Sequence, residues 1–215
     1  MKEMLERYVV MLTEANKTQN LISRQTTADE MGDHIADSLA LLDFMELKGR
    51  SVLDIGSGQG FPAIPLSLAE PECSFVMVES DLKKSGFLIE IQHSLPVQNA
   101  KVIRGRVEEL ARKSEYRAGF DVVTCRAVAG LSTILEWGLP LLKVGGILVA
   151  WKGARIMEEI DESKVALDSM GGVISQVKEY EIAEKPRSLA LIEKIKETPD
   201  RYPRRGGLAK KRPIR

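Results

Sequence analysis

The sequence predicts an α/β protein in which a mostly parallel sheet carries helices on both faces. Three observations support this fold class. From residue 51 onward, short apolar runs alternate with segments of helical periodicity, the pattern of repeated strand–helix–strand units. A glycine-rich turn directly follows the first of these runs, where such proteins connect a strand to a helix. The length of 215 residues suits one domain of ordinary size with a short extension.

Residues 1–47 are expected to form a helical extension that packs on the domain. Apolar side chains between residues 4 and 12 fall on one stripe of a helix. A second helix is expected to begin at a capping box formed by Thr27 and Glu30. Its apolar positions recur every three or four residues and share one face: Met31, Ile35, Leu39, Leu42 and Met45.

The α/β domain itself is expected to span residues 48–200. Five short apolar runs predict strands at residues 52–55, 75–78, 101–103, 121–125 and 147–151. Helical segments are expected between them at residues 62–68, 82–93, 107–113 and 131–142. A further helix over residues 157–169 precedes two longer alternating runs, 173–182 and 188–196. These two runs predict a hairpin at one edge of the sheet, with residues 184–187 between its strands.

The composition indicates a soluble globular protein. Apolar residues make up 44% and charged residues 29%, and no apolar run approaches the roughly 20 residues that cross a bilayer. The N-terminus mixes acids with bases, which argues against a signal peptide. Cys73 and Cys125 are the only cysteines, and neither a CxxC spacing nor a histidine cluster occurs. We therefore expect a cytoplasmic protein that binds neither a membrane nor a metal.

The charges are unevenly distributed although they cancel over the whole chain. Residues 201–215 contain seven basic residues and no acid, whereas the other 200 residues carry 24 bases against 31 acids. Such a basic C-terminal tail often contacts phosphate backbones. The alternatives are a solvated, disordered end or one held by acidic groups of its own domain. The tail contributes five candidate RNA-binding residues: Arg204, Arg205, Lys210, Lys211 and Arg212.

The segment of residues 54–61, Asp-Ile-Gly-Ser-Gly-Gln-Gly-Phe, predicts a loop that binds a nucleotide-type cofactor. It joins a predicted strand to a predicted helix, at the sheet edge where open α/β proteins bind ligands. Gly56, Gly58 and Gly60 allow positive φ and close approach of a ligand to the backbone. The N–H groups at the start of the helix suit a carboxylate.

Two details of this loop favour S-adenosylmethionine over a nicotinamide dinucleotide. Phe61 stands where the dinucleotide fingerprint GxGxxG requires glycine. Asp54 lies two residues before the first glycine, which resembles the first motif of class I methyltransferases. Glu79 ends the second predicted strand and can accept hydrogen bonds from both ribose hydroxyls, a feature that both cofactor classes share. An ordinary strand–helix turn and a solvated strand end are the structural alternatives.

Nearly the whole chain resembles the bacterial 16S rRNA (guanine-N7) methyltransferase G family, formerly called glucose-inhibited division protein B. The most specific matching segments are His34-Ile-Ala-Asp-Ser-Leu and Arg126-Ala-Val-Ala. Further matches are Lys83-Lys84, Arg106-Val-Glu-Glu, Lys152-Gly153 and Tyr202-Pro203-Arg204. The glycine-rich loop is less specific, because many methyltransferases share it.

This resemblance implies a class I S-adenosylmethionine-dependent methyltransferase fold, Rossmann-like, with a seven-stranded sheet and an antiparallel edge hairpin. It implies methylation of N7 of one guanine in the 530 loop of 16S rRNA, either free or in the small ribosomal subunit. It also implies that the cofactor site contains Gly56, Phe61, Val107, Glu108 and Arg126. The pattern of the loop and of the second strand adds three further candidates for the cofactor site: Gly58, Gly60 and Glu79.

No catalytic acid or base is expected. The N7 atom of guanine has a free lone pair, so its methylation can rely on alignment and desolvation. His34, Asp37 and Ser38 share one helix face and are candidates for RNA contact or for a hydrogen bond within the protein. Arg126 can hold a carboxylate or phosphate, or it can form a structural salt bridge. Trp137 and Trp151 are assigned to the core.

Two alternatives for the whole chain stay open. One is a class I methyltransferase that acts on a protein or a small molecule. The other is an RNA-binding ribosome-assembly factor with a vestigial cofactor pocket. In each case a monomer is expected.

Overall fold

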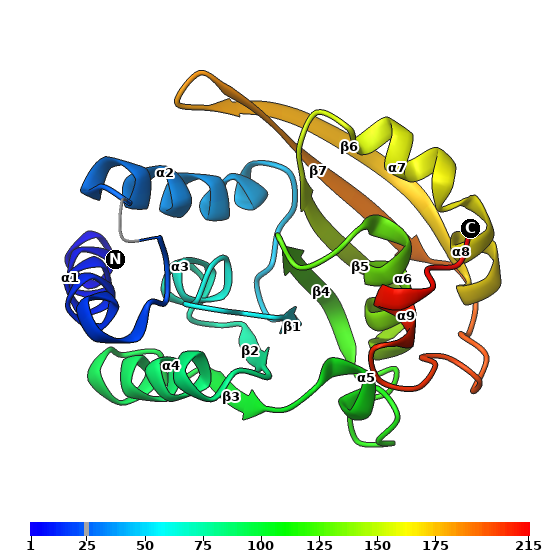
Figure 1. Ribbon diagram of the computed structural model, residues 1–215, viewed down its shortest axis with the longest axis horizontal. Helices are drawn as coiled ribbons and strands as arrows, with labels where there is room; N and C mark the ends of the chain where they lie inside the picture. Colours follow the sequence, from blue (N-terminus) through cyan, green and yellow to red (C-terminus); the bar gives the residue numbers. More distant parts are fainter. Residues whose placement is uncertain (24–25) are drawn as a thin grey trace.

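The computed structural model describes residues 1–23 and 26–215, and it is built around one seven-stranded sheet (Figure 1). The strand order is β3-β2-β1-β4-β5-β7-β6. The first five strands are parallel to one another, and β7 is antiparallel to both of its neighbours, β5 and β6. The predicted fold class is therefore confirmed. The strands are β1 Ser51–Ile55, β2 Ser74–Glu79, β3 Ala100–Arg104, β4 Phe120–Arg126, β5 Leu142–Lys152, β6 Gly172–Ile182 and β7 Lys185–Lys194.

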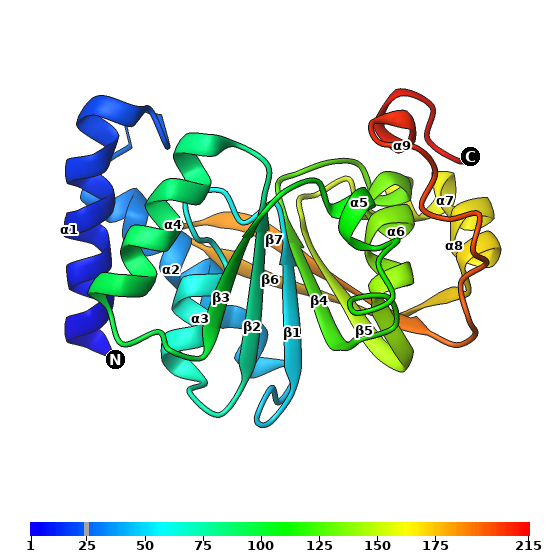
Figure 2. The same ribbon diagram turned by 90° about the horizontal axis from the view of Figure 1, so that it is seen from below.

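Helices cover both faces of the sheet, as Figure 2 shows. Neighbouring strand residues alternate between two hydrophobic clusters, so that Val52 lies in one and Leu53 in the other. The helices are α1 Lys2–Gln19, α2 Ala28–Leu39, α3 Ala63–Ala69, α4 Leu82–Ser94, α5 Val107–Leu110, α6 Leu131–Gly138, α7 Ile156–Glu162, α8 Lys164–Met170 and α9 Leu208–Lys211. Helices α1 to α4 share the first cluster, and α5 to α8 share the second.

The N-terminal helices lie directly against the domain. Helix α1 packs on α3 and α4 through the buried side chains of Tyr8 and Leu12. The phenol of Tyr8 donates a hydrogen bond to the backbone oxygen of Gln59 at 2.8 Å, so α1 supports the glycine-rich loop. Helix α2 begins at the predicted capping box, in which the Thr27 hydroxyl accepts from the Glu30 N–H and the Glu30 carboxylate accepts from the Thr27 N–H.

Several boundaries predicted from the sequence were wrong: α5 ends at Leu110, α6 ends at Gly138, and β5 already begins at Leu142. The hairpin turn consists of Ala183 and Glu184 rather than residues 184–187, and β7 already begins at Lys185. Both turn residues have positive φ, 50° and 58°, the conformation that matches the twist of a two-residue hairpin. Neither is glycine or asparagine, so the usual sequence signal is missing. The helix expected over residues 157–169 is divided at Ser163 into α7 and α8.

No helix in the described residues is long and apolar enough to span a membrane. A search of the same residues finds no group of three or more His, Cys, Asp or Glu placed to hold a metal ion.

Candidate active site

The glycine-rich loop follows β1 and bends back beneath the start of α3. Gly56, Gly58 and Gly60 all have positive φ, 66°, 58° and 116°. A Cβ on Gly56 would lie 2.8 Å from the Val128 side chain, and one on Gly60 would lie 2.7 Å from Ile64. The first and third glycines are therefore required by packing as well as by backbone conformation.

The carboxylate of Glu79 is fixed at the end of β2. One oxygen accepts the N–H of Gly58 at 2.8 Å, and the other accepts the N–H of Asp81 at 2.8 Å. Each carboxylate oxygen has a second lone pair, and Glu79 lines a cavity beside the loop. The residue is thus held in one orientation and can still accept hydrogen bonds from a ligand's hydroxyl groups.

Asp54 supports the loop from within the sheet. Its Oδ1 accepts a hydrogen bond from the Thr124 hydroxyl at 2.6 Å, and its backbone oxygen accepts one from the Ser57 hydroxyl at 3.2 Å. The Oδ2 atom is buried and has no hydrogen-bond partner in the described part of the chain. Burial raises the pKa of Asp54 to about 7.

Two adjoining cavities run along the C-terminal edge of the parallel strands. The first, of about 340 Å³, contains the predicted site residues Gly56, Gly58, Phe61, Glu79 and Arg126 in its lining. The second, of about 180 Å³, is lined by Gly56, Val107 and Glu108 among others. The structure thus brings these seven residues to one cleft, while Gly60 lies beneath the loop against Ile64. Their roles toward the cofactor remain predictions.

Arg126, at the end of β4, joins the two family-specific segments that the sequence analysis singled out separately. Its guanidinium contacts Asp37 Oδ2 at 3.2 Å and donates to Ser38 Oγ at 3.2 Å and to the His34 backbone oxygen at 3.0 Å. It also lies 2.5 Å from His34 Nδ1 and 5.6 Å from the centre of the Phe61 ring. The three helix residues proposed for RNA contact therefore surround this guanidinium.

Burial and charge set the protonation of this cluster. Burial and the nearby Arg126 cation lower the pKa of His34, so its ring is neutral at pH 7 and Nδ1 can accept the hydrogen bond from Arg126. Burial also lowers the pKa of Arg126, while Asp37 opposes that shift. The arginine stays charged, because its ordinary pKa is far above neutrality.

A third cavity, of about 350 Å³, lies on the other side of Arg126, and sequence reasoning missed Arg187 in its lining. Lys152 and Arg187 reach it from β5 and β7. The Arg187 Nε is buried without a partner in the described residues. The Tyr180 hydroxyl, on β6, donates to Asp37 Oδ1 at 2.6 Å and so holds the carboxylate that pairs with Arg126. The hairpin register, which pairs Tyr180 with Arg187, brings these two side chains here, and no local motif marks either of them.

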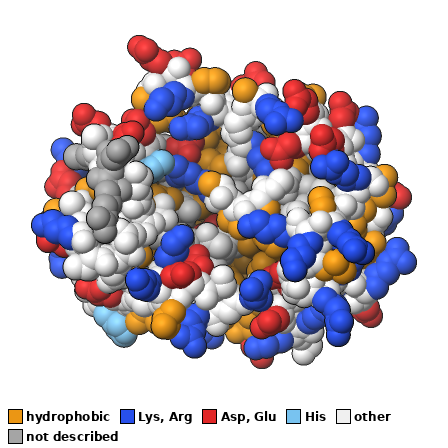
Figure 3. Space-filling model, viewed as in Figure 1, with side chains coloured by type: hydrophobic (Ala, Val, Ile, Leu, Met, Phe, Trp, Pro, Cys, Tyr) orange, Lys and Arg blue, Asp and Glu red, His pale blue; other side chains and the backbone are white. Residues whose placement is uncertain are grey.

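The basic tail is divided between the domain and the surface. The Arg204 side chain is bound by Glu136, whereas Arg205, Lys210, Lys211 and Arg212 are exposed. Lys210 lines the second cavity beside Glu108. In the view of Figure 3, which is that of Figure 1, Lys and Arg side chains gather on the right half of the molecule, where the tail lies. Of the three possibilities for the tail, the structure shows a segment held by acidic groups of its own domain. The predicted RNA contacts stay untested.

Comparisons with known proteins agree with this geometry. A family model described as rRNA small subunit methyltransferase G matches residues 1–189. The ribosomal RNA small subunit methyltransferase G of Syntrophomonas wolfei is 45% identical over 205 residues, covering 95% of this chain and 95% of that protein. The protein of the same name from Clostridium tetani is 37% identical over 212 residues, covering 97% and 89%.

Solved structures of low sequence identity share the fold. A SAM dependent methyltransferase from Aquifex aeolicus superposes with a TM-score of 0.58 at 15% identity, covering 85% of this chain and 98% of that chain. This likeness concerns the fold alone, and it agrees with the class I arrangement predicted from the sequence.

Proposed function

The chain belongs to the rRNA small subunit methyltransferase G family, and on that premise we propose that it methylates N7 of one guanine in the 530 loop of 16S rRNA. Membership makes it an rRNA methyltransferase that uses S-adenosylmethionine. The observation that carries the finer proposal is the position of Arg126, which lines both the 340 Å³ cavity of the glycine-rich loop and the 350 Å³ cavity beyond it. A methyl donor in the first cavity and a base in the second would meet at this residue.

The residues of the cleft fit S-adenosylmethionine. Glu79 offers fixed carboxylate oxygens for ribose hydroxyls, and Gly56 and Gly58 line the cavity without a side chain, so a ligand can approach their backbone closely. Val107 and Glu108 line the 180 Å³ cavity, whose size and mixed lining suit the adenine. When bound, the cofactor supplies an electrophilic methyl group on a sulfonium centre.

The chain's own contribution to the reaction is positioning. The lone pair of guanine N7 needs no deprotonation, and the neutral His34 beside Arg126 is not required as a base. Arg126 and Arg187 both line the outer cavity and present guanidinium N–H groups. Such groups bind guanine O6 or a phosphate oxygen well, which would orient the base and exclude water.

We further propose a division of labour along the chain. Residues 48–200 form the methyltransferase domain, residues 1–47 brace the cofactor loop through Tyr8, and residues 201–215 carry exposed cations. The proposed partner is 16S rRNA, free or within the small ribosomal subunit, and we propose a cytoplasmic protein that acts as a monomer.

Methyl transfer from labelled S-adenosylmethionine tests the proposed function. Naked 16S rRNA, assembled small subunits and total protein are offered separately, and nucleosides from the labelled RNA are identified after digestion. We expect label in RNA as 7-methylguanosine at a single position. Label found exclusively in protein would refute the rRNA substrate, and binding without any transfer would favour an assembly factor with a vestigial pocket.

A further inference from the structure

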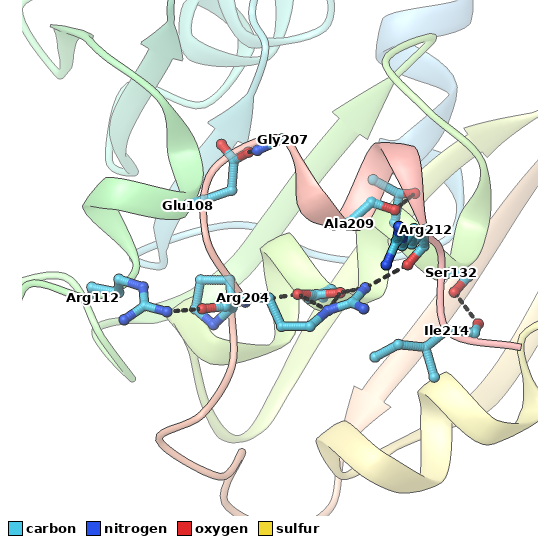
Figure 4. A network of polar contacts seen from close by, with 11 residues as sticks. Glu108, Arg112, Ser132, Arg204, Gly207, Ala209, Arg212 and Ile214 are labelled. Carbon is cyan, nitrogen blue, oxygen red and sulfur yellow. Dashed lines mark hydrogen bonds and ion pairs between the residues drawn. The ribbon is translucent and has the colours of Figure 1, made fainter.

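The basic tail of residues 201–215 is anchored to the domain by a buried ion pair. The Arg204 guanidinium contacts both carboxylate oxygens of Glu136 at 2.6–3.0 Å, and the Arg204 N–H donates to the same carboxylate at 2.7 Å (Figure 4). Glu136 lies on α6 and is fully buried. A carboxylate in that position needs its partner, so this contact fixes where the tail begins.

Further contacts hold the tail on both sides of Gly207. The Arg112 side chain donates to the Pro203 oxygen at 2.6 Å, and the Thr133 hydroxyl donates to the Ala209 oxygen at 3.1 Å. The Ser132 hydroxyl donates to the Ile214 oxygen near the end of the chain. Ala209 is buried in the same hydrophobic cluster as α6. The tail therefore follows a defined path across α5 and α6.

This path closes one side of the 180 Å³ cavity. Gly207 N–H donates to Glu108 Oε1 at 2.9 Å (Figure 4). Both Gly207 and Lys210 line the cavity. Trp137 lines it as well, and its indole N–H is buried with no hydrogen-bond partner among the described residues. A buried donor left without a partner is costly, and it indicates a site that a ligand completes.

We propose that residues 207–210 and Trp137 form the closing wall of the adenosine pocket, which makes the basic tail a part of the cofactor site. The proposal rests on the function proposed above, because that function places the adenine in this cavity. A flat base with ring nitrogens can accept the Trp137 N–H and pack on Val107 and Val128. The match to the family model ends at residue 189, so residues 207–210 lie outside the matched segment and Trp137 lies within it.

Gly207 gives a way to detach the wall while keeping the anchor at Arg204. Its φ is +78°, and its N–H is the donor to Glu108. Gly207→Pro removes that N–H and cannot adopt a positive φ. Gly206→Ala is the matched control, since a Cβ there would meet nothing closer than the Arg106 Cδ at 3.8 Å.

Calorimetric titration of the full-length protein with S-adenosylhomocysteine and with 5′-methylthioadenosine measures the effect. We expect Gly207→Pro to weaken both ligands at least about tenfold and by a similar factor, because the wall contacts the part that they share. Gly206→Ala should stay within about twofold of the parent. Trp137→Phe keeps an aromatic side chain and leaves the tail unchanged but removes the five-membered ring with its N–H, and it should weaken both ligands about threefold to tenfold.

Gly58→Asp distinguishes failure of this inference from failure of the proposed site. It adds a side chain at a positive φ and a negative charge beside Glu79. If Gly58→Asp abolishes binding while Gly207→Pro and Trp137→Phe bind normally, the wall proposal is overturned and the cofactor site stands. If none of the three changes affinity, the cofactor site itself is wrong. Should Gly207→Pro fail to fold, Trp137→Phe decides the question alone.

Discussion

Two arginine–carboxylate pairs hold the two ends of the chain against the domain, and they differ in geometry: Arg204 binds Glu136 on α6, and Arg126 at the end of β4 binds Asp37 on α2. Arg204 grips Glu136 with both a side-chain fork and a backbone N–H, at 2.6–3.0 Å. Arg126 reaches Asp37 through a single contact of 3.2 Å and shares its remaining donors with His34 and Ser38. Arg126 also lines two cavities.

This difference in geometry indicates that the Arg204–Glu136 pair is a structural clamp, whereas the Arg126–Asp37 pair belongs to the ligand site. A bidentate pair whose carboxylate is fully buried uses the arginine's donors for the fold. A looser pair at the rim of two cavities keeps the guanidinium oriented while part of it still faces a ligand. The Asp37 carboxylate on α2 also accepts a hydrogen bond from Tyr180 on β6, so it is held in place from a second strand while it contacts Arg126.

The largest effect on stability is expected for Arg204→Ala. The substitution leaves the buried Glu136 charge without its partner, which costs about 3–5 kcal/mol of unfolding free energy. Urea denaturation of the full-length protein measures this loss. The neighbouring Arg205→Ala is the control and should change stability by less than about 0.5 kcal/mol, since its side chain is exposed. A loss below about 1 kcal/mol for Arg204→Ala would show that the clamp is not structural.

Arg126→Lys should reduce activity strongly and stability only slightly, the reverse of what is expected for Arg204→Ala. Lysine keeps the charge but lacks the planar fork that contacts Asp37, Ser38 and the ligand side together. We expect kcat/KM for rRNA methylation to fall about 30- to 100-fold, equivalent to about 2–3 kcal/mol. The unfolding free energy should fall by less than about 1.5 kcal/mol. Full activity with a large loss of stability would make Arg126 a second clamp and remove the contrast.

The fold could be predicted largely from local sequence patterns, whereas the contacts around Arg126 could not, because they join residues far apart in the chain. The sequence pattern located the strands and most helices, because the central strands are buried on both faces and form short apolar runs, whereas each helix buries one stripe of apolar residues. It also marked the His34 and Arg126 segments, but as separate features, since their contact joins residues 92 positions apart. Arg187 and Tyr180 carry no local signal; their role depends on the hairpin register.

For the tail, the sequence predicted the charge but not the position. Its composition predicted only charge, because seven cations without an acid describe equally a solvated end and an anchored one. The tail is fixed by a buried acid, Glu136, on a helix that carries no other charged side chain. A pattern of residue types does not show which distant carboxylate a given arginine will meet.

The smallest expected effect concerns the cations that the clamp leaves free. Arg205 and Lys211 are exposed, and neither lines the adenosine pocket. The double variant Arg205→Gln/Lys211→Gln should bind 16S rRNA less than about tenfold more weakly at low salt. It should also lower the slope of log affinity against log salt by about 1–2, as expected when two phosphate contacts are lost. The control, Lys17→Gln/Lys164→Gln, removes the same charge from two exposed lysines held in local ion pairs with Glu14 and Asp161. Equal slopes for the two double variants would show that the tail serves the fold and the cofactor pocket alone, because a cation that contacts RNA must release counterions when it binds.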